Sequence, residues 1–425
     1  MTPPSAPSRQ VVLVSNGPGE LLTWVRPTLD TLRRLDPDVR VAIALIPCQF
    51  AGGSESTLAA TFGADAVTTP QEYVRAAATG RAPAALQGAD RGVVVSMGGN
   101  GALAVSLARR LRVPAVRYSF VPYFARGLER LFVHDDATRR KARLFGASAD
   151  RVEVVGNLVA DAVHAAPPIA NAGSPHVLLL AGSRDAFAVH LIPFMIALAD
   201  QLAPRYPGAR FVWPVSRLLR EATIDAGIAG VEAGTLGGVA GRRDGDRVHA
   251  PHGAVVEIVH EEERHAHMRA ATIAVTIPGT NTLELGIAGV PSVVMLPLNR
   301  PEVIPLEGPG HWLSLLPVVG TALKRNAVRL FVERLRYPIS LPNQFSREAL
   351  MVELKGVVDP SGVAAAAAAL IDDTNDLARR RARLLATMPG PGAAERLIRR
   401  IYHDAGWEAP PLGVAAPADA RAPGE

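Results

Sequence analysis

The hydrophobic positions in the first half of the chain form short, continuous apolar runs that alternate with stretches of helical spacing. The first run, residues 11–14, ends at the small and polar residues 15–20, and a helical pattern follows through Leu21, Val25 and Leu29. Continuous apolar strands that alternate with helices are typical of a parallel sheet with helices on both faces. The same pattern predicts further strands at 39–46, 66–68, 93–95, 115–118, 131–134 and 152–155.

The pattern restarts after residue 175, with predicted strands at 177–180, 210–215, 273–276 and 293–296. We therefore expect an α/β protein of two doubly wound, Rossmann-like domains that face each other across a cleft. The predicted organisation is a disordered N-terminus (1–10), a first domain (11–165), a linker (166–175), a second domain (176–375), C-terminal helices (376–407) and a disordered tail (408–425).

Composition narrows the class of protein. Of the 425 residues, 48% are hydrophobic and 20% are charged, which is enough apolar material for two cores. The single cysteine, Cys48, excludes a disulfide framework and a metal site built from several cysteines. No uninterrupted apolar stretch reaches the roughly 18 residues of a membrane-spanning helix, and the polar N-terminus does not resemble a secretory signal. We expect a cytoplasmic protein, soluble or peripheral on the inner face of the cytoplasmic membrane.

The net charge of +5 lies in the first domain. Residues 1–165 contain 19 basic and 14 acidic side chains, whereas residues 166–425 contain 26 of each. A basic domain favours an anionic partner. Aromatic residues make up only 5% of the chain and do not interleave with the basic runs, so we expect no nucleic acid. Phospholipid headgroups or a phosphorylated lipid fit at least as well.

The strongest local motif is Ile-Pro-Gly-Thr-Asn-Thr-Leu-Glu-Leu-Gly at 277–286, which follows a strand and opens a helix. Backbone N–H groups and hydroxyls at the positive end of a helix suit phosphate oxygens. Glu284, in the first turn of that helix, has the carboxylate to accept two ribose hydroxyls. The alternative is an ordinary helix cap with a stabilising glutamate. The candidate phosphate ligands are Gly279, Thr280, Asn281 and Thr282.

A second small-residue turn, Gly182, Ser183 and Arg184, follows the first strand of the second domain. Such a turn admits a ligand closely, and an arginine there can neutralise phosphate through a bidentate contact. A plain strand–helix turn with a solvated arginine is the alternative. Two phosphate-type turns in one domain together predict that the second domain binds a nucleotide.

Two turns of the first domain are candidates for the substrate side. Residues 15–20, Ser-Asn-Gly-Pro-Gly-Glu, contain no Lys or Arg and match no phosphate-loop fingerprint, so Asn16 and Glu20 are better placed for a substrate than for phosphate. Glu20 is a candidate general base, and a helix-opening glutamate is its alternative. In the glycine-rich turn at 96–101, Asn100 offers one polar side chain, unless this is only a tight turn.

Three further stretches have weaker claims to function. Residues 260–267 are rich in His and Glu but do not have the His-Glu-x-x-His spacing, so we expect a solvated, charged helix face rather than a metal site. His134-Asp-Asp is likewise no metal signature, and we predict no required metal or cofactor. The apolar stretch 312–323, which precedes Lys324, Arg325 and Arg329, suits interfacial membrane binding or a buried element.

The order of these motifs resembles the lipid-A-disaccharide synthase family, glycosyltransferases of the GT-B fold. The resemblance extends from about residue 11 to residue 402, and rests on the turns 182–184 and 278–284, on 289–294 and 341–343 in the second domain, and on 155–163 near the domain junction. It implies an inverting, metal-independent hexosyltransferase of lipid A biosynthesis that holds a UDP-sugar, of the N-acetylglucosamine type, in its second domain. It further implies a lipid or other hydrophobic acceptor at the membrane surface. We also consider a homodimer.

The chain departs from this family in its first domain. After Gly19 and Glu20 it continues Leu-Leu-Thr-Trp, where the family usually continues x-Ser-Gly-Asp, and the turn at 96–101 lacks the Asp that the family uses there. Glu20 is the one carboxylate left in these two turns. We therefore expect a related enzyme with a different acceptor. The alternatives are a UDP-sugar 2-epimerase of the same fold, and a nucleotide-sugar-binding protein without catalysis.

Overall fold

The chain forms two compact units in a computed structural model that describes residues 8–47, 55–167, 169, 174–299 and 337–408. Unit 1 comprises Met1–Ala162 and Pro391–Glu425, and unit 2 comprises Val163–Gly390. Cys48, the stretch 312–329 and the tail from residue 409 on lie outside the described residues, so the predictions made for them are not addressed.

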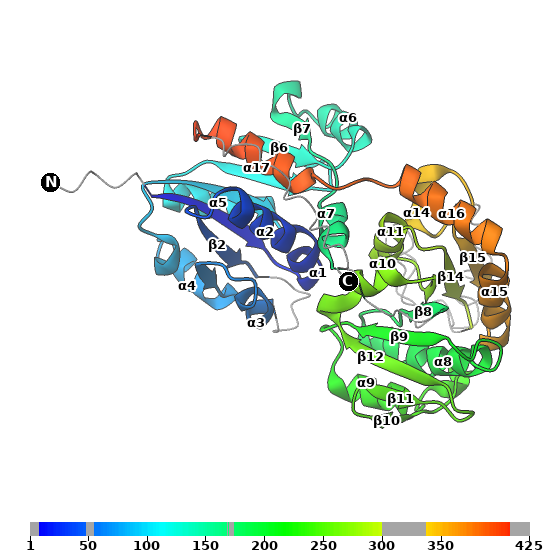
Figure 1. Ribbon diagram of the computed structural model, residues 1–425. Coiled ribbons are helices and arrows are strands. Elements are labelled where there is room, and N and C mark those ends of the chain that lie inside the picture. Colours follow the sequence, from blue (N-terminus) through cyan, green and yellow to red (C-terminus); the bar gives the residue numbers. More distant parts are fainter. Residues whose placement is uncertain (1–7, 48–54, 168, 170–173, 300–336, 409–425) are drawn as a thin grey trace, which may run out of the picture. The chain divides into compact units, whose positions relative to one another are not determined.

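Unit 1 is built on a parallel sheet of seven strands in the order β3-β2-β1-β4-β5-β6-β7. Figure 1 labels β2, β6 and β7 of this sheet. The strands are β1 (Arg9–Ser15), β2 (Arg40–Leu45), β3 (Ala66–Thr68), β4 (Arg91–Met97), β5 (Ala115–Ser119), β6 (Arg130–Val133) and β7 (Val152–Val154). Every strand predicted in the first half occurs, with ends that differ by at most two residues. Continuous apolar runs identify these strands well because both faces of the sheet are covered.

Helices pack on both faces of this sheet. Val11 and Leu13 of β1 belong to the core beneath α2 and α17, while Val12 and Val14 face the core beneath α4 and α5. The helical elements of unit 1 are α1 (Pro18–Glu20), the π-helical turn η1 (Leu21–Val25), α2 (Arg26–Leu35), α3 (Glu55–Ala60), α4 (Pro70–Ala78), η2 (Ala84–Leu86), α5 (Gly101–Leu111), α6 (Asp136–Leu144), η3 (Ala149–Arg151) and α17 (Ala393–Asp404); α7 (Leu158–Ala165) contains the boundary between the units.

The last described helix, α17, returns to unit 1 and completes its core. Leu397, Ile401 and Tyr402 pack with α2, and the hydroxyl of Tyr402 donates to the Asp36 carboxylate at 2.9 Å. The Asp161 carboxylate accepts the first backbone N–H groups of the helix, with distances of 2.8 Å to Gly392 N and 3.0 Å to Ala393 N. The stretch 376–407 therefore divides between the units at the Gly-Pro-Gly break.

Unit 2 is built on eight strands in the order β10-β11-β12-β9-β8-β13-β14-β15. The strands are β8 (His176–Leu179), β9 (Arg210–Val215), β10 (Arg242–Asp244), β11 (Arg247–His249), β12 (Val255–His260), β13 (Ile273–Thr276), β14 (Ser292–Pro297) and β15 (Val352–Gly356). Strands β10 to β12 pair antiparallel, and the others pair parallel. The four predicted strands occur, while β10, β11, β12 and β15 were not predicted.

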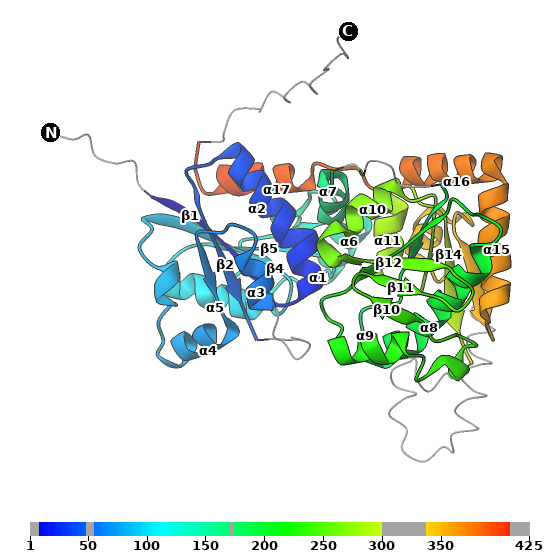
Figure 2. The ribbon, with the colours of Figure 1, turned by 60° about the horizontal axis from the view of Figure 1, so that its bottom comes forward.

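The helices of unit 2 also lie on both faces of the sheet (Figure 2). Helices α8, α9 and α15 cover one face, and α10, α11 and α16 cover the other. The elements are α8 (Asp185–Leu202), α9 (Glu221–Ile228), η4 (Ala233–Thr235), η5 (Glu261–Glu263), α10 (Arg264–Ala270), α11 (Thr280–Ile287), α14 (Leu341–Ser346), α15 (Pro360–Asp372) and α16 (Thr374–Thr387).

Among the described helices, α8 alone has the length and mean hydropathy of a membrane span, with 18 residues and a mean hydropathy of 1.3. Two thirds of it (67%) is buried inside the protein, and its apolar residues pack against α9 and α15. A core helix passes the same test of length and composition, so this helix is weak evidence for a membrane.

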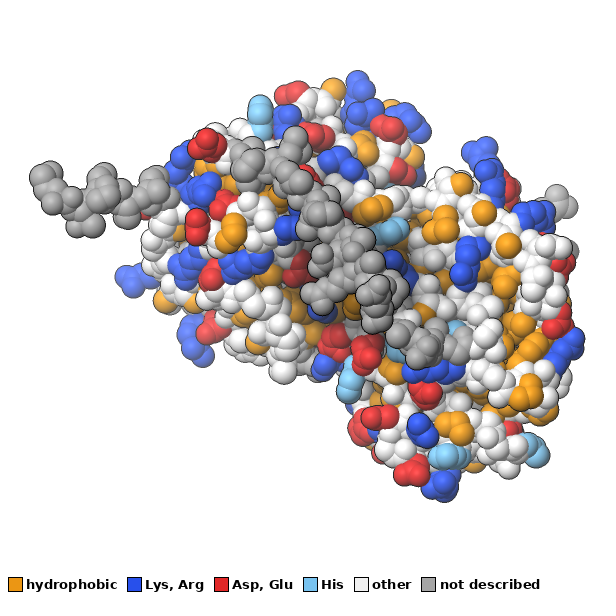
Figure 3. Space-filling model, in the orientation of Figure 1, with side chains coloured by type: hydrophobic (Ala, Val, Ile, Leu, Met, Phe, Trp, Pro, Cys, Tyr) orange, Lys and Arg blue, Asp and Glu red, His pale blue; other side chains and the backbone are white. Residues whose placement is uncertain are grey.

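Basic and acidic side chains are interspersed on the surface of unit 1 that Figure 3 shows. Arginines of unit 1 also have acidic partners, such as Arg33 with Asp65 at 2.7 Å and Arg34 with Glu395 at 3.3 Å. The excess positive charge of residues 1–165 is therefore not gathered into one continuous basic patch on this face.

Candidate functional site

The two predicted phosphate turns of unit 2 lie side by side. In the sheet of unit 2, β9 is the neighbour of β8 toward one edge, whereas β13 and β14 lie toward the opposite edge. The strand order therefore reverses between β8 and β13. In open α/β sheets, ligands bind at the carboxyl ends of the strands at this switch point. The turn after β8 and the turn after β13 meet there: a Cβ atom on Gly182 would lie 3.2 Å from Cδ1 of Ile277.

The turn after β13 presents backbone rather than side chains. Gly279 has a φ of 146°, a conformation that favours glycine, and Gly279 and Thr280 are exposed at the start of α11. The first N–H groups of a helix have no partner within the helix. Thr282 is fully buried, and its hydroxyl donates to the Gly279 carbonyl at 2.8 Å and accepts from Leu341 N at 3.1 Å. Thr282 therefore stabilises the conformation of the turn. The remaining residue, Asn281, is half-buried.

The turn after β8 presents side chains to solvent. Ser183 and Arg184 are exposed, and Gly182, with a φ of 83°, makes the bend. Asp185 follows as the first residue of α8, and the Arg220 side chain donates to its carboxylate at 2.6 Å. The acidic group next to Arg184 is thus already neutralised.

Glu284 lies inside unit 2 behind these turns, with a side chain only 3% exposed. The Arg264 guanidinium contacts its carboxylate at 3.0 Å, and His265 Nε2 lies 2.9 Å away. Burial alone would raise the pKa of Glu284, but Arg264 and His265 lower it overall, so the carboxylate is ionised. Burial lowers the pKa of His265, which favours a neutral ring that donates to Glu284.

Arg264 also contacts a second buried carboxylate, that of Glu261, at 3.0 Å. Glu261 accepts from Arg217 N at 2.8 Å and from the Ser216 hydroxyl at 3.4 Å, which ties it to the end of β9. The predicted solvated helix face at 260–267 is therefore wrong for part of its polar residues. Glu261, His265 and His267 are each at most 8% exposed, because these side chains pack inward, whereas His260 and Glu263 are exposed as predicted.

Unit 1 has a switch point of the same kind, between β1 and β4. Asn16 and Glu20 follow β1, and both pack against the glycines after β4. A Cβ atom on Gly98 would lie 3.1 Å from Asn16 Oδ1 and 3.1 Å from Glu20 Cγ, and one on Gly99 would lie 2.9 Å from Asn16 Cγ. Both glycines also have positive φ angles, of 113° and 62°. Asn100 is the N-cap of α5, where its Oδ1 accepts from the N–H of the second helical residue at 3.0 Å.

Two further residues at this edge of unit 1 were not predicted as site residues. His134 follows β6, its Nδ1 is buried without a described partner, and burial lowers the pKa of its imidazole. Arg117 on β5 is 8% exposed, and its Nε has no described partner. The signal for both is a polar side chain in or directly after an apolar strand. His134 was weighed only as a metal ligand, and no group of three or more His, Cys, Asp or Glu side chains fit for a metal occurs among the described residues.

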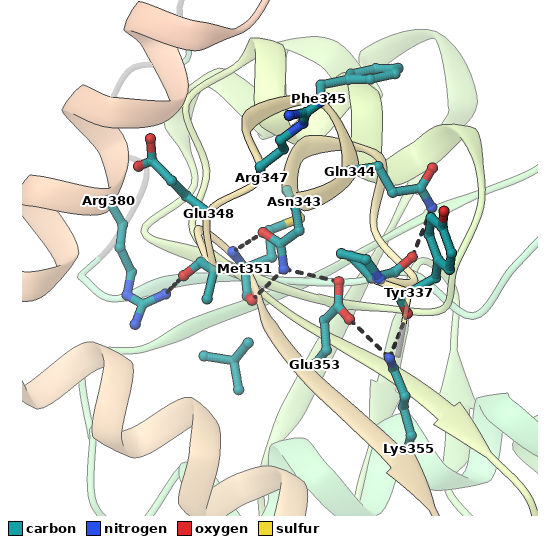
Figure 4. A pocket seen from close by; sticks show the side chains of 13 residues that line it. Tyr337, Asn343, Gln344, Phe345, Arg347, Glu348, Met351, Glu353, Lys355 and Arg380 are labelled. Carbon is teal, nitrogen blue, oxygen red and sulfur yellow. Dashed lines mark hydrogen bonds and ion pairs between the residues drawn. The ribbon is translucent and has the colours of Figure 1, made fainter. Parts of the chain in front are cut away.

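A pocket of about 1000 Å³ lies beside β15 in unit 2 (Figure 4). Its central carboxylate, Glu353, accepts from the backbone of Ile339 and Ser340, from the Ser340 hydroxyl and from Asn343 Nδ2 at 2.7–3.0 Å. Burial raises the pKa of Glu353, and these hydrogen bonds lower it overall. Because its polar groups hold α14 and β15 together, this pocket is not our candidate site.

Comparison with known proteins bears on the fold. No family model matches the sequence, and no curated protein matches it significantly. A solved structure of UDP-N-acetylglucosamine 2-epimerase aligns with a TM-score of 0.56 and 13% identity, over 95% of this chain and 98% of that chain. The UDP co-structure of MnaA from S. aureus aligns with a TM-score of 0.52 and 14% identity, over 94% and 98%. The UDP-GlcNAc 2-epimerase of Neisseria meningitidis, bound to UDP-GlcNAc, gives 0.51 and 13%, over 93% and 100%.

These matches confirm the predicted fold class and correct the predicted activity. The chain has a GT-B-like fold of two Rossmann-like α/β units. The predictions of a hexosyltransferase and of lipid A biosynthesis are wrong, because the structures that match nearly the whole chain include UDP-N-acetylglucosamine 2-epimerases. They give no support to a lipid acceptor or a membrane surface. The resemblance misled because the motifs that carried it lie mainly in the predicted nucleotide-binding domain, and a fold does not determine the reaction.

Proposed function

We propose that this protein binds a UDP-sugar through unit 2 and inverts the sugar at C2, as a UDP-sugar 2-epimerase. The observation that carries the proposal is the pair of turns at the switch point of unit 2, backed by the buried Glu284. Exposed backbone N–H groups at the start of α11 and the Arg184 side chain suit a diphosphate. The solved structures with this fold include one in complex with UDP and one in complex with UDP-GlcNAc, which supports the choice of ligand.

Glu284 has a defined part in this proposal. Its carboxylate orients Arg264 and His265, and a carboxylate offers about four lone-pair sites, which leaves capacity for a ribose hydroxyl. The role of Glu284 in ribose binding stays a prediction. The role of Ser183, Asn281 and the other turn residues in phosphate binding also stays a prediction.

Inversion at C2 breaks the C2–H bond, and its electron pair can be accommodated if the C1–O bond to UDP breaks and UDP leaves. The reaction therefore needs groups that take and return a proton while UDP stays bound and both bonds re-form. Glu20 and His134 of unit 1 are our candidates. His134 suits the acceptor role because its lowered pKa keeps the ring neutral at pH 7. Asn16 remains a candidate contact to the substrate, whereas Asn100 serves as a helix cap. The proposal requires no metal and no cofactor, and UDP-sugar is its substrate.

The nucleotide part is tested by calorimetric titration with UDP, ADP and GDP. We expect UDP-selective binding that weakens by about tenfold or more in Glu284→Gln, because the neutral amide holds Arg264 and His265 less firmly. Glu348→Gln is the matched control, since Glu348 forms an exposed pair with Arg383. Absence of binding to every nucleotide would overturn the proposal.

The catalytic part is tested by incubating UDP-N-acetylglucosamine alone in D₂O and following C2 by NMR. We expect a second C2 epimer and deuterium at C2, and loss of both in Glu20→Gln or His134→Gln with UDP binding retained. UDP binding by the wild type without any epimer or deuterium would reject the epimerase and leave a nucleotide-sugar-binding protein.

A further inference from the structure

Arg117 is a buried cation without an acidic partner among the described residues. Arg117 lies on β5 and is 8% exposed. No described carboxylate lies within 4 Å of its guanidinium as an ion-pair partner. Its Nη2 donates to the Gly99 carbonyl at 3.2 Å, and its Nε is buried without a described partner. Burial lowers the pKa of this arginine, yet an arginine stays protonated in proteins. An unpaired buried charge is costly, so its retention requires an explanation.

The surroundings of Arg117 make this cost larger. A Cβ atom on Gly101 would lie 2.7 Å from Arg117 Nη1, so the guanidinium lies against the first residue of α5, an 11-residue helix. The N-terminus of a helix is itself equivalent to about half a positive charge. Two positive groups thus meet at one place. Asn100 already accepts the second N–H of α5 at 3.0 Å, so an anion bound there would contact the guanidinium and the N–H of Gly101 together, as charge-assisted hydrogen bonds allow.

The neighbouring side chain of Asn16 indicates that the bound anion also has a hydroxyl group. Asn16 packs against Gly99, the glycine whose carbonyl accepts from Arg117, and its Oδ1 is buried without a described donor. A buried acceptor without a donor costs free energy, and a ligand hydroxyl would supply that donor. Gly98 and Gly99 have no Cβ, and the side chains of Asn16 and Glu20 fill that space, so the two glycines let Asn16 pack directly against the backbone beside Arg117.

We propose that unit 1 has its own anion-binding site, formed by Arg117, the start of α5 at Gly101, and Asn16, which takes the oxyanion group of a small polyhydroxyl molecule. Sugar acids and sugar phosphates both have this chemistry, an oxyanion group together with several hydroxyl groups. This site lies within unit 1, whereas the nucleotide turns belong to unit 2, and it shares Asn16 with the substrate side of the function proposed above.

The test measures the thermal midpoint of the full chain, saturated with UDP, against rising concentrations of glucuronate, glucose 6-phosphate or glucose. Under the proposed function, UDP fills the unit 2 turns, so that an added sugar anion cannot act there. If UDP does not bind, the same titration is made with an Arg184→Gln variant, which removes the arginine of those turns. A ligand that binds only the folded state raises the midpoint with its concentration. We expect a rise with at least one anionic sugar and none with neutral glucose; which anion acts distinguishes carboxylate from phosphate.

Three variants locate the effect. Arg117→Met should weaken the anion response by about tenfold or more, and Arg117→Lys should restore part of it. Gly101→Ala places a methyl group against Nη1, so it should displace the guanidinium and weaken the response in a chain that still folds. Arg140→Met, an exposed arginine on α6, is the control and should respond as the wild type does. An unchanged response in both Arg117→Met and Gly101→Ala, or no response to either anion in the wild type, would overturn the site.

Discussion

At the switch point of unit 2, buried charged groups contact one another, whereas at that of unit 1 several buried polar groups have no partner among the described residues. Arg264 lies between the carboxylates of Glu261 and Glu284 in unit 2. In unit 1, Arg117 Nε and Asn16 Oδ1 are buried without described partners. Because an unpaired buried group costs free energy, our two proposals differ in what a ligand would supply: the buried charges of unit 2 already have their partners, whereas in unit 1 a ligand would provide the missing contacts.

Arg264→Met should produce the largest effect on stability. It leaves two buried carboxylates without their shared cation, and breaking such a pair costs about 3 to 5 kcal/mol in the free energy of unfolding. Denaturant unfolding monitored by circular dichroism measures the change. Arg217→Met is the matched control, since Arg217 is 43% exposed and pairs with Glu262 at the surface. Equal effects of the two substitutions would show that Arg264 has no special place in unit 2.

Unit 2 also holds a buried histidine pair whose effect depends on pH. His267 Nδ1 lies 3.4 Å from His176 Nε2, and burial, followed by His176 and Arg210, lowers the pKa of His267 to about 4, with Glu257 opposing. The unfolded chain therefore binds the proton first as the pH falls from 6.5. The stability from the neutral ring is complete above that pH and is lost as the pH approaches 4.

Between these two pH values, the wild type should lose about 2 to 3 kcal/mol more unfolding free energy than His267→Gln. Urea unfolding at several pH values measures the slope. His403→Gln is the control, because His403 is 75% exposed. Parallel pH profiles for wild type and His267→Gln would show that the ring takes up its proton equally in the folded and unfolded chain.

Away from its switch point, unit 1 supplies backbone N–H groups to a half-buried carboxylate, that of Asp161. Asp161→Ala removes the acceptor of the first N–H groups of α17, which should cost about 1 to 2 kcal/mol. Unfolding with denaturant measures this, and Asp136→Ala, at an exposed position on α6, should stay within about 0.5 kcal/mol of wild type. A loss as small as that of the control would mean that packing alone holds α17 in place.

The sequence predicts the fold better than it predicts the site, for physical reasons. Buried strands such as β9 and β13 are apolar runs, whereas β12 and β15 contain Glu257, Glu353 and Lys355 and do not read as strands. The turns at 182–184 and 279–282 can be recognised in the sequence because each is a local motif. That they lie side by side follows from the pairing of β8 with β13 in the sheet. The contacts of Glu284 with the segment 264–265 join different helices, so a run of charges that reads as surface gave no indication of them.

Arg117→Met makes the same substitution in unit 1 as Arg264→Met makes in unit 2, and it should have the smallest effect. Without added anions, it removes a buried charge that no described carboxylate balances, and a methionine fills similar space. Replacing buried charges by apolar groups is often neutral or stabilising, so we expect a gain between zero and about 1 kcal/mol. Denaturant unfolding in a buffer with chloride as the sole anion measures it. A loss as large as that of Arg264→Met would mean that Arg117 is a structural cation like Arg264, and the contrast between the two switch points would no longer hold.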